Sequence, residues 1–171
     1  MENDVINLAG IVEESIVDGP GFRYVLFTQG CPHKCKGCHN PQTHDKSLGQ
    51  PTKINKIVED INKNPLLRGI TISGGEPFLQ AKQLSNLISK IDTNKLDVMV
   101  YTGFEYEYLK ENSNENNSFD SLLDKADVLI DGKFDINLKT DVLPFRGSMN
   151  QRSIDCKRSI ETGNTILYNF N

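Results

Sequence analysis

The hydrophobic and polar positions of the chain alternate between two periods. Short runs rich in β-branched and aromatic residues predict buried strands over residues 24–28, 69–73, 97–101 and 128–130. Apolar residues that recur every three or four positions predict helices. Two helices follow from the stripes Ile54, Ile57, Val58, Ile61 and Leu84, Leu87, Ile88, Ile91, and shorter helical pieces are expected over 105–110 and 119–125.

The remaining segments have weaker patterns. Residues 6–17 fit a hairpin or an extra edge strand, and 153–161 and 165–168 fit a last helix and a last strand. Residues 111–118 are dominated by Asn and Glu, which predicts an exposed loop between two elements.

The regular alternation of strands and helices predicts parallel strands joined by right-handed crossovers. At roughly 30 residues per strand–helix unit, a chain of 171 residues holds about five or six units. An eight-stranded barrel of about 250 residues is therefore out of reach. We expect an α/β fold in the form of a partial (open) parallel β/α barrel, with residues 1–171 as one domain.

Composition and charge exclude several classes of protein. The chain is 37% hydrophobic and 25% charged, which is ordinary for a globular protein. Its net charge of −4 removes the electrostatic argument for binding nucleic acid. No apolar run approaches the roughly 18 residues of a membrane span, and residues 1–4 are polar and acidic, unlike a secretory leader. We expect a soluble, cytoplasmic protein without a nucleic-acid or membrane partner.

Three of the four cysteines lie in one short segment, at Cys31, Cys35 and Cys38, and Cys156 lies far away. Disulfides within the cluster would close very small rings and leave an odd thiol. Clustered thiols in a reducing compartment indicate metal or redox chemistry instead.

Two kinds of metal site fit this cluster. Zinc takes four ligands, and His33 or His39 could complete the set, but structural zinc sites usually have a second pair of ligands further along the chain. A 4Fe–4S cluster has four irons, so three cysteines leave one iron open to a small molecule. Cys156 could close that position, but an isolated cysteine is more often a small buried hydrophobic residue. We favour the open cluster.

Polar motifs follow four of the predicted strands. The cysteine segment follows 24–28, Gly74-Gly75-Glu76 follows 69–73, Thr102-Gly103 follows 97–101, and Asp131-Gly132-Lys133 follows 128–130. Because parallel α/β folds bind ligands at the carboxyl ends of their strands, we expect these motifs to converge on one rim. Taken singly, each motif also fits a simple turn. His33 and His44 are expected on the surface.

In this order, the motifs resemble the radical S-adenosylmethionine (SAM) superfamily, which carries the same three-cysteine spacing followed by Gly-Gly-Glu. The segments 18–23 and 38–40 resemble glycyl-radical-enzyme activases. The segments 101–103, 130–134 and 146–152 resemble the activases of anaerobic ribonucleoside-triphosphate reductase.

This resemblance implies one 4Fe–4S cluster and SAM as cofactors. Cys31, Cys35 and Cys38 would each hold an iron, and the amino and carboxylate groups of SAM would chelate the fourth. The implied contacts with the cofactors are Gly37, Cys38, His39, Gly74, Gly75, Glu76, Thr102, Asp131 and Lys133.

Individual roles also follow from the resemblance. Glu76 would accept hydrogen bonds from the ammonium of SAM, Lys133 would meet its carboxylate, and Asp131 would hold a cation or orient Lys133. Many members of the superfamily have an aromatic residue where this chain has Gly37. The Gly37 backbone or His39 is therefore expected to face the adenine.

The implied reaction is reductive cleavage of SAM to methionine and a 5′-deoxyadenosyl radical, which takes hydrogen from a glycine Cα of the reductase. No catalytic side chain is implied beyond the cluster and SAM, and the electron donor would be a flavodoxin or ferredoxin. Two alternatives stay open: a radical SAM enzyme for another glycyl-radical enzyme or a small metabolite, and a non-catalytic zinc-binding interaction module.

Overall fold

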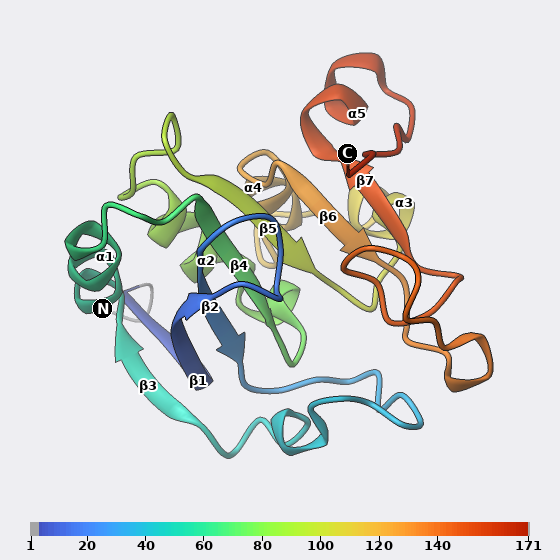
Figure 1. Ribbon diagram of the computed structural model, residues 1–171, viewed down its shortest axis with the longest axis horizontal. Coiled ribbons are helices and arrows are strands. Elements are labelled where there is room, and N and C mark those ends of the chain that lie inside the picture. The colour runs from blue at the N-terminus through green and yellow to red at the C-terminus, as the bar shows by residue number, and fades with distance from the viewer. Residues whose placement is uncertain (1–3, 171) are drawn as a thin grey trace.

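A seven-stranded mixed sheet forms the centre of the computed structural model, which describes residues 4–170 (Figure 1). Its strands are β1 (Val5–Ser15), β2 (Arg23–Thr28), β3 (Gln50–Lys53), β4 (Gly69–Gly74), β5 (Asp97–Tyr101), β6 (Val128–Asp131) and β7 (Arg152–Asp155). Its helices are α1 (Ile54–Lys63), α2 (Ala81–Ile88), α3 (Tyr106–Glu111), α4 (Phe119–Leu123) and α5 (Cys156–Thr162).

The strand order is β3-β1-β2-β4-β5-β6-β7. The four strands β2, β4, β5 and β6 run parallel, whereas β1 pairs antiparallel with β2 and β3, and β7 pairs antiparallel with β6. The parallel strands therefore all end on the same edge of the sheet. Figure 1 shows the loops that follow β2 and β6 together at that edge.

The α/β class and the four parallel strands confirm the sequence prediction, but the number of strand–helix units is smaller than expected. Only three crossovers join parallel strands within residues 4–170, because both ends of the chain form antiparallel strands. The segment expected as a hairpin or an edge strand is β1, which lies inside the sheet because β3 pairs along its outer side.

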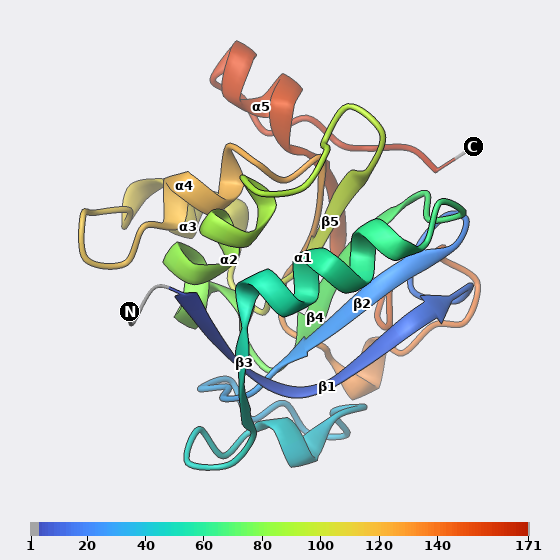
Figure 2. The ribbon, with the colours of Figure 1, turned by 90° about the vertical axis from the view of Figure 1, so that its left-hand side faces the viewer.

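The two faces of the sheet have different neighbours. Alternate strand residues such as Ile70, Ile72 and Val98 face α1, α2, α3 and α4 and form the main core with them. Figure 2 shows α2, α3 and α4 together on one side of the sheet. On the opposite face, a small apolar group of Met99, Val128 and Ile130 packs against parts of the chain's C-terminal third. The rest of that face is free to line a site.

The C-terminal region differs from its prediction. The expected helix over 153–161 begins only at Cys156, because the preceding residues pair with β6 as β7 and the Asp155 side chain accepts the Arg158 N–H as the helix cap. The expected last strand is reduced to a single bridge between Leu167 and Ile154. The loop predicted over 111–118 is confirmed as an irregular connection between α3 and α4 over residues 112–118, while Glu111 is the last residue of α3.

No helix within residues 4–170 combines the length and the apolar character that a bilayer span requires.

One side chain joins three of these elements. Arg152 of β7 donates to Asp131 of β6 at 3.0 Å and to both carboxylate oxygens of Glu107 on α3, at 3.1 and 2.7 Å. The hydrogen bonds from Arg152 lower the pKa of Glu107 from its ordinary 4.5 to about 2. The antiparallel edge of the sheet is thereby fastened to the helical layer.

This pKa shift predicts how stability depends on pH. A carboxyl with a lowered folded-state pKa stabilises the fold above its unfolded pKa and loses that contribution as pH falls through the folded value. We therefore expect the free energy of unfolding to fall between pH 4.5 and 2 more steeply in the wild type than in Glu107→Gln. Urea denaturation across this range measures the difference, and parallel curves for the two proteins would contradict it.

Candidate functional site

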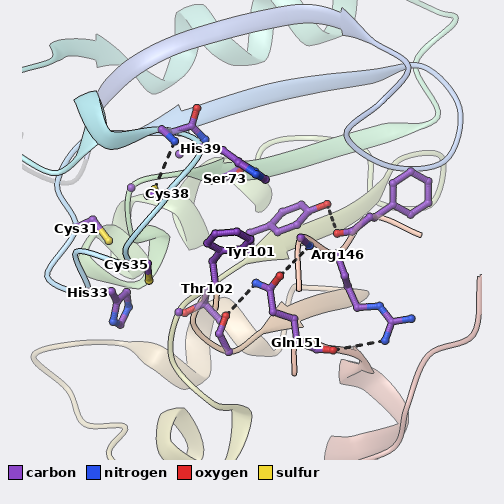
Figure 3. A pocket seen from close by; sticks show the side chains of 18 of the residues that line it. Cys31, His33, Cys35, Cys38, His39, Ser73, Tyr101, Thr102, Arg146 and Gln151 are labelled. Atoms are coloured by element: carbon purple, nitrogen blue, oxygen red, sulfur yellow. Dashed lines mark hydrogen bonds between the residues drawn. The ribbon is translucent and has the colours of Figure 1, made fainter. Parts of the chain in front are cut away.

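A cavity of about 610 Å³ opens at the carboxyl ends of β2, β4 and β5, on the face of the sheet opposite the main helices. Four chain segments that follow parallel strands contribute to its wall. The lining includes Cys31, Cys35, Cys38, His39, Ser73, Gly74, Gly75, Tyr101, Thr102, Gly103, Gly132, Phe134, Arg146 and Gln151. Figure 3 shows the cysteine segment on one side of the cavity and Arg146 and Gln151 on the other.

The cysteine segment is a closed loop directly after β2. Its base is held by two backbone hydrogen bonds, from Gly30 N–H to Thr43 O at 2.7 Å and from Cys31 N–H to His44 O at 3.1 Å. Inside the loop, the Cys38 N–H donates to Cys35 O at 3.2 Å. All three cysteines are free and partly exposed toward the cavity. The spacing in the sequence thus becomes three thiols on one short loop.

The chemistry of these thiols fits an iron–sulfur cluster, whose irons are held by cysteine thiolates. Burial raises the pKa of Cys31 and of Cys35, so both are protonated thiols at neutral pH and would release their protons on binding metal. Within residues 4–170, no three His, Cys, Asp or Glu side chains are grouped closely enough to hold a single metal ion.

Gly74 and Gly75 line the cavity, and the structure gives a reason for their lack of side chains. Gly75 donates its N–H to Thr28 O at 2.8 Å, which brings the ends of β4 and β2 into close contact. A Cβ on Gly75 would overlap the carbonyl oxygen of Gly30, and Gly74 also has a φ of +94°, a conformation that favours glycine. The two glycines are needed by the strand ends themselves, as well as by any ligand that approaches.

Glu76 is fully buried and joins the cysteine loop to the strand ends. Its carboxylate accepts from Thr102 Oγ1 at 2.9 and 3.0 Å, from Gly103 N–H at 2.9 Å and from Phe78 N–H at 3.0 Å. His33 Nε2 lies 2.6 Å from Glu76 Oε2. Both carboxylate oxygens therefore already have donors from within the chain.

The prediction that His33 lies on the surface is wrong, and His44, which was also expected on the surface, is only partly exposed. The His33 side chain is 6% exposed, because it packs onto Glu76, and His44 lines the cavity with a buried Nε2 that has no hydrogen-bond partner in the described structure. The His33 ring is held by tertiary contacts with Glu76 and Phe104 that its immediate sequence neighbours do not indicate.

The other residues with implied cofactor roles divide into two groups. Cys38, His39 and Thr102 form the first group, and they line the cavity with the two glycines. Asp131 belongs to the second group, which lies outside the cavity lining. It is 1% exposed, and its carboxylate accepts hydrogen bonds from Arg152 and from the Tyr106 N–H at 2.8 Å.

Lys133 and Gly37 also lie outside the cavity lining. Lys133 is exposed and lies close enough to Cys35 to lower the pKa of that thiol, although the effect of burial is larger. Gly37 packs against Ile136, and its φ of +75° is a conformation that glycine adopts readily.

Some lining residues carried no predicted role. Tyr101 reaches across the cavity face and donates its hydroxyl to Phe145 O at 2.8 Å, and Phe134 packs its ring 5.1 Å from that of His39. The sequence signal for both was their position beside the motifs after β5 and β6.

The loop after β6 is held to the strand end by Gln151. This side chain donates to Gly132 O at 3.0 Å and accepts from Gly147 N–H at 2.9 Å and Ser148 N–H at 3.2 Å. Arg146 is presented at the cavity wall by the same loop, with a buried Nε that has no hydrogen-bond partner in the described structure.

Comparison with known proteins identifies relatives for this architecture. A family model described as a 4Fe-4S single cluster domain matches residues 17–154. An anaerobic ribonucleoside-triphosphate reductase-activating protein of Enterobacteria phage T4 is 37% identical over 143 residues, which cover 80% of this chain and 85% of the relative. A protein of the same name from Escherichia coli K12 is 38% identical over 144 residues, with 80% and 90% covered. The crystal structure of QueE from Escherichia coli aligns with a TM-score of 0.43 and 20% identity over 58% of this chain and 52% of that one, a likeness too low to carry an argument.

Cysteine replacements distinguish the loop thiols from Cys156. Replacing Cys31, Cys35 or Cys38 by Ala should abolish stable iron binding, because each removes a thiol that faces the cavity. The matched control is Cys156→Ala, since Cys156 is fully buried in the helix-side core and should not affect iron content. Iron and sulfide analysis after anaerobic reconstitution gives the result. Loss of iron in Cys156→Ala would instead indicate a closed cluster with four cysteine ligands.

Alanine at position 75 tests the contact between strand ends. We expect Gly75→Ala to lower the free energy of unfolding by about 1–3 kcal/mol, the usual cost of forcing an extra methyl group into a filled space. Gly10→Ala is the matched control, because a Cβ there meets no atom within 4 Å. Urea denaturation of the metal-free proteins compares the two, and equal stabilities would show that the strand ends tolerate the methyl group.

Proposed function

Because the chain belongs to the family of anaerobic ribonucleoside-triphosphate reductase-activating proteins, we propose that it installs a glycyl radical on that reductase. The protein would do so with one 4Fe–4S cluster and SAM. When bound and reduced by an external electron donor, the cluster would supply the one electron that cleaves SAM to methionine and a 5′-deoxyadenosyl radical, and this radical would remove a hydrogen atom from a glycine Cα of the reductase.

The observation that carries this proposal is the meeting of three free thiols with the ends of the neighbouring parallel strands in one cavity. Cys31, Cys35 and Cys38 would hold three irons and leave the fourth open to the amino and carboxylate groups of SAM. The cavity extends well beyond the cysteines, to Tyr101 and Arg146, and so has room for the rest of SAM.

Roles for the surrounding residues follow from their positions. The backbone of Gly74 and Gly75 would approach the methionyl group. His39 and Phe134, whose rings are adjacent at the cavity wall, would contact the adenine. Lys133 would attract the carboxylate of SAM from the rim. Asp131 would act indirectly, by fixing Arg152.

The open side of the sheet suits a protein substrate. We infer that the sheet is the wall of a partial barrel within a single domain, and that the glycine-bearing segment of the reductase covers its open mouth. Exposed apolar side chains lie where such a segment would enter: Val17, which lines the cavity, is 75% exposed, and Val142, beside the lining residues Asp141 and Leu143, is 89% exposed. A flavodoxin or ferredoxin would deliver the electron, and the free thiols suit the reducing cytoplasm.

Anaerobic mixing of the reconstituted protein with the reductase, SAM and a chemical reductant tests the proposal. We expect a glycyl-radical doublet in the EPR spectrum and formation of 5′-deoxyadenosine. A reductase in which the glycine is replaced by alanine is the control, and it should give no doublet. A brown protein that cleaves SAM but produces no radical on this reductase would point to another glycyl-radical enzyme or to a small metabolite.

The metal itself tests the non-catalytic alternative. The reconstituted protein should contain about four irons per chain, as one 4Fe–4S cluster requires. A colourless protein that binds one zinc tightly and does not cleave SAM would contradict the proposed function.

A further inference from the structure

The side chain of His33 is enclosed by groups from two strand ends. Its Nε2 lies 2.6 Å from Glu76 Oε2, after β4, and its ring meets the ring of Phe104, after β5, edge-on at 4.6 Å between centroids. Gly103 lies against the same ring so closely that a Cβ there would overlap it. His33 is therefore held in a shaped site although it belongs to an excursion of the chain between Cys31 and Cys35.

The donors on Glu76 differ in how firmly they are fixed. Phe78 N–H belongs to the turn that starts at Glu76 itself, and Thr102 and Gly103 follow β5 within the sheet framework. His33 reaches Glu76 from the cysteine loop through one side-chain contact. Of these donors, it is the one that can withdraw without disturbing the sheet.

An arriving ammonium group has three N–H donors and no acceptor, and a buried carboxylate is its natural partner. Both oxygens of Glu76 are already occupied, so a new donor must displace an existing one. The contact made by His33 is the replaceable one.

We propose that His33 is a positioning residue that occupies, on Glu76, the place taken by the ammonium of SAM when SAM binds. In the protein without SAM, His33 ties the cysteine loop to the strand ends and keeps it ordered. Binding of SAM then requires His33 to leave Glu76, so this contact sets part of the cost of binding. The inference rests on the proposed function in taking SAM as the ligand.

The first test measures order of the loop in the full-length, metal-free protein without SAM. His33→Leu keeps an apolar side chain beside Phe104 but removes the donor, and it should increase amide hydrogen exchange over residues 31–38 and at Gly103. His33→Gln places an amide N–H near the position of Nε2 and should restore protection. Lys36→Gln, an exposed position in the same loop, is the matched control and should exchange like the wild type. If amide hydrogen exchange in His33→Leu is as slow as in the wild type, the positioning role is overturned.

The second test measures SAM affinity by calorimetry on the cluster-loaded proteins. His33→Leu should bind SAM roughly tenfold more tightly, the ratio expected when a hydrogen bond to a charged group no longer has to be broken. His33→Gln should bind SAM with an affinity close to that of the wild type. Weaker or unchanged binding of SAM to His33→Leu would overturn the proposal that SAM displaces His33 from Glu76. If His33 only supported the fold, its replacement would lower both the order of the loop and the affinity for SAM.

The two tests separate this inference from the proposed function. If the cluster-loaded wild type does not bind SAM at all, the proposed function fails, and the displacement of His33 from Glu76 by SAM fails with it. The loop measurement uses neither cluster nor SAM, so it still decides whether His33 positions the cysteine loop. If SAM binds to the wild type and His33→Leu does not increase the affinity for SAM, only the proposed displacement of His33 from Glu76 is wrong.

Discussion

The buried carboxylate of Glu76 is the interaction on which the geometry of the site depends. A carboxylate without solvent is costly unless every oxygen has donors, and here the donors come from the turn after β4, from the end of β5 and from the cysteine loop. Satisfying one side chain therefore forces three separate chain segments into fixed positions. The thiols face the same cavity because the loop that carries them is part of this network.

The mixed sheet determines which face can hold a site. Parallel strands bring their polar ends to one edge, and α1 to α4 cover only one face. The antiparallel strands β1 and β7 extend the sheet without adding a helix to the other face, so the cavity keeps an open side. A protein substrate can approach such a site directly, whereas a small metabolite is usually bound in a more enclosed pocket.

Two charged residues that lie only two positions apart in the sequence have separate tasks in the fold. Asp131 turns toward the helical layer, where Arg152 and the N–H of Tyr106 satisfy it, while Lys133 remains exposed near Cys35. Gly132 separates the two residues, and its φ of +96° takes the backbone out of the extended strand conformation, so the two side chains do not continue one face of β6. Arg152 holds the antiparallel edge in place and so supports the loop that carries Arg146 and Gln151 to the cavity wall.

The sequence by itself determined the α/β class, the four parallel strands and the segments that meet at the cavity. Hydrophobic periodicity marks each strand and helix locally, and ligands of parallel α/β folds bind at the carboxyl ends of the strands, so the segments that follow the strands could be identified. The spacing of Cys31, Cys35 and Cys38 likewise fixed the thiol loop. Only the tertiary structure decided that β1 and β7 pair antiparallel and that Asp131 faces away from the cavity. It alone also decided that His33 lies buried on Glu76. These features depend on contacts between residues far apart in the chain, such as the 43 positions that separate His33 from Glu76, and no local pattern encodes them.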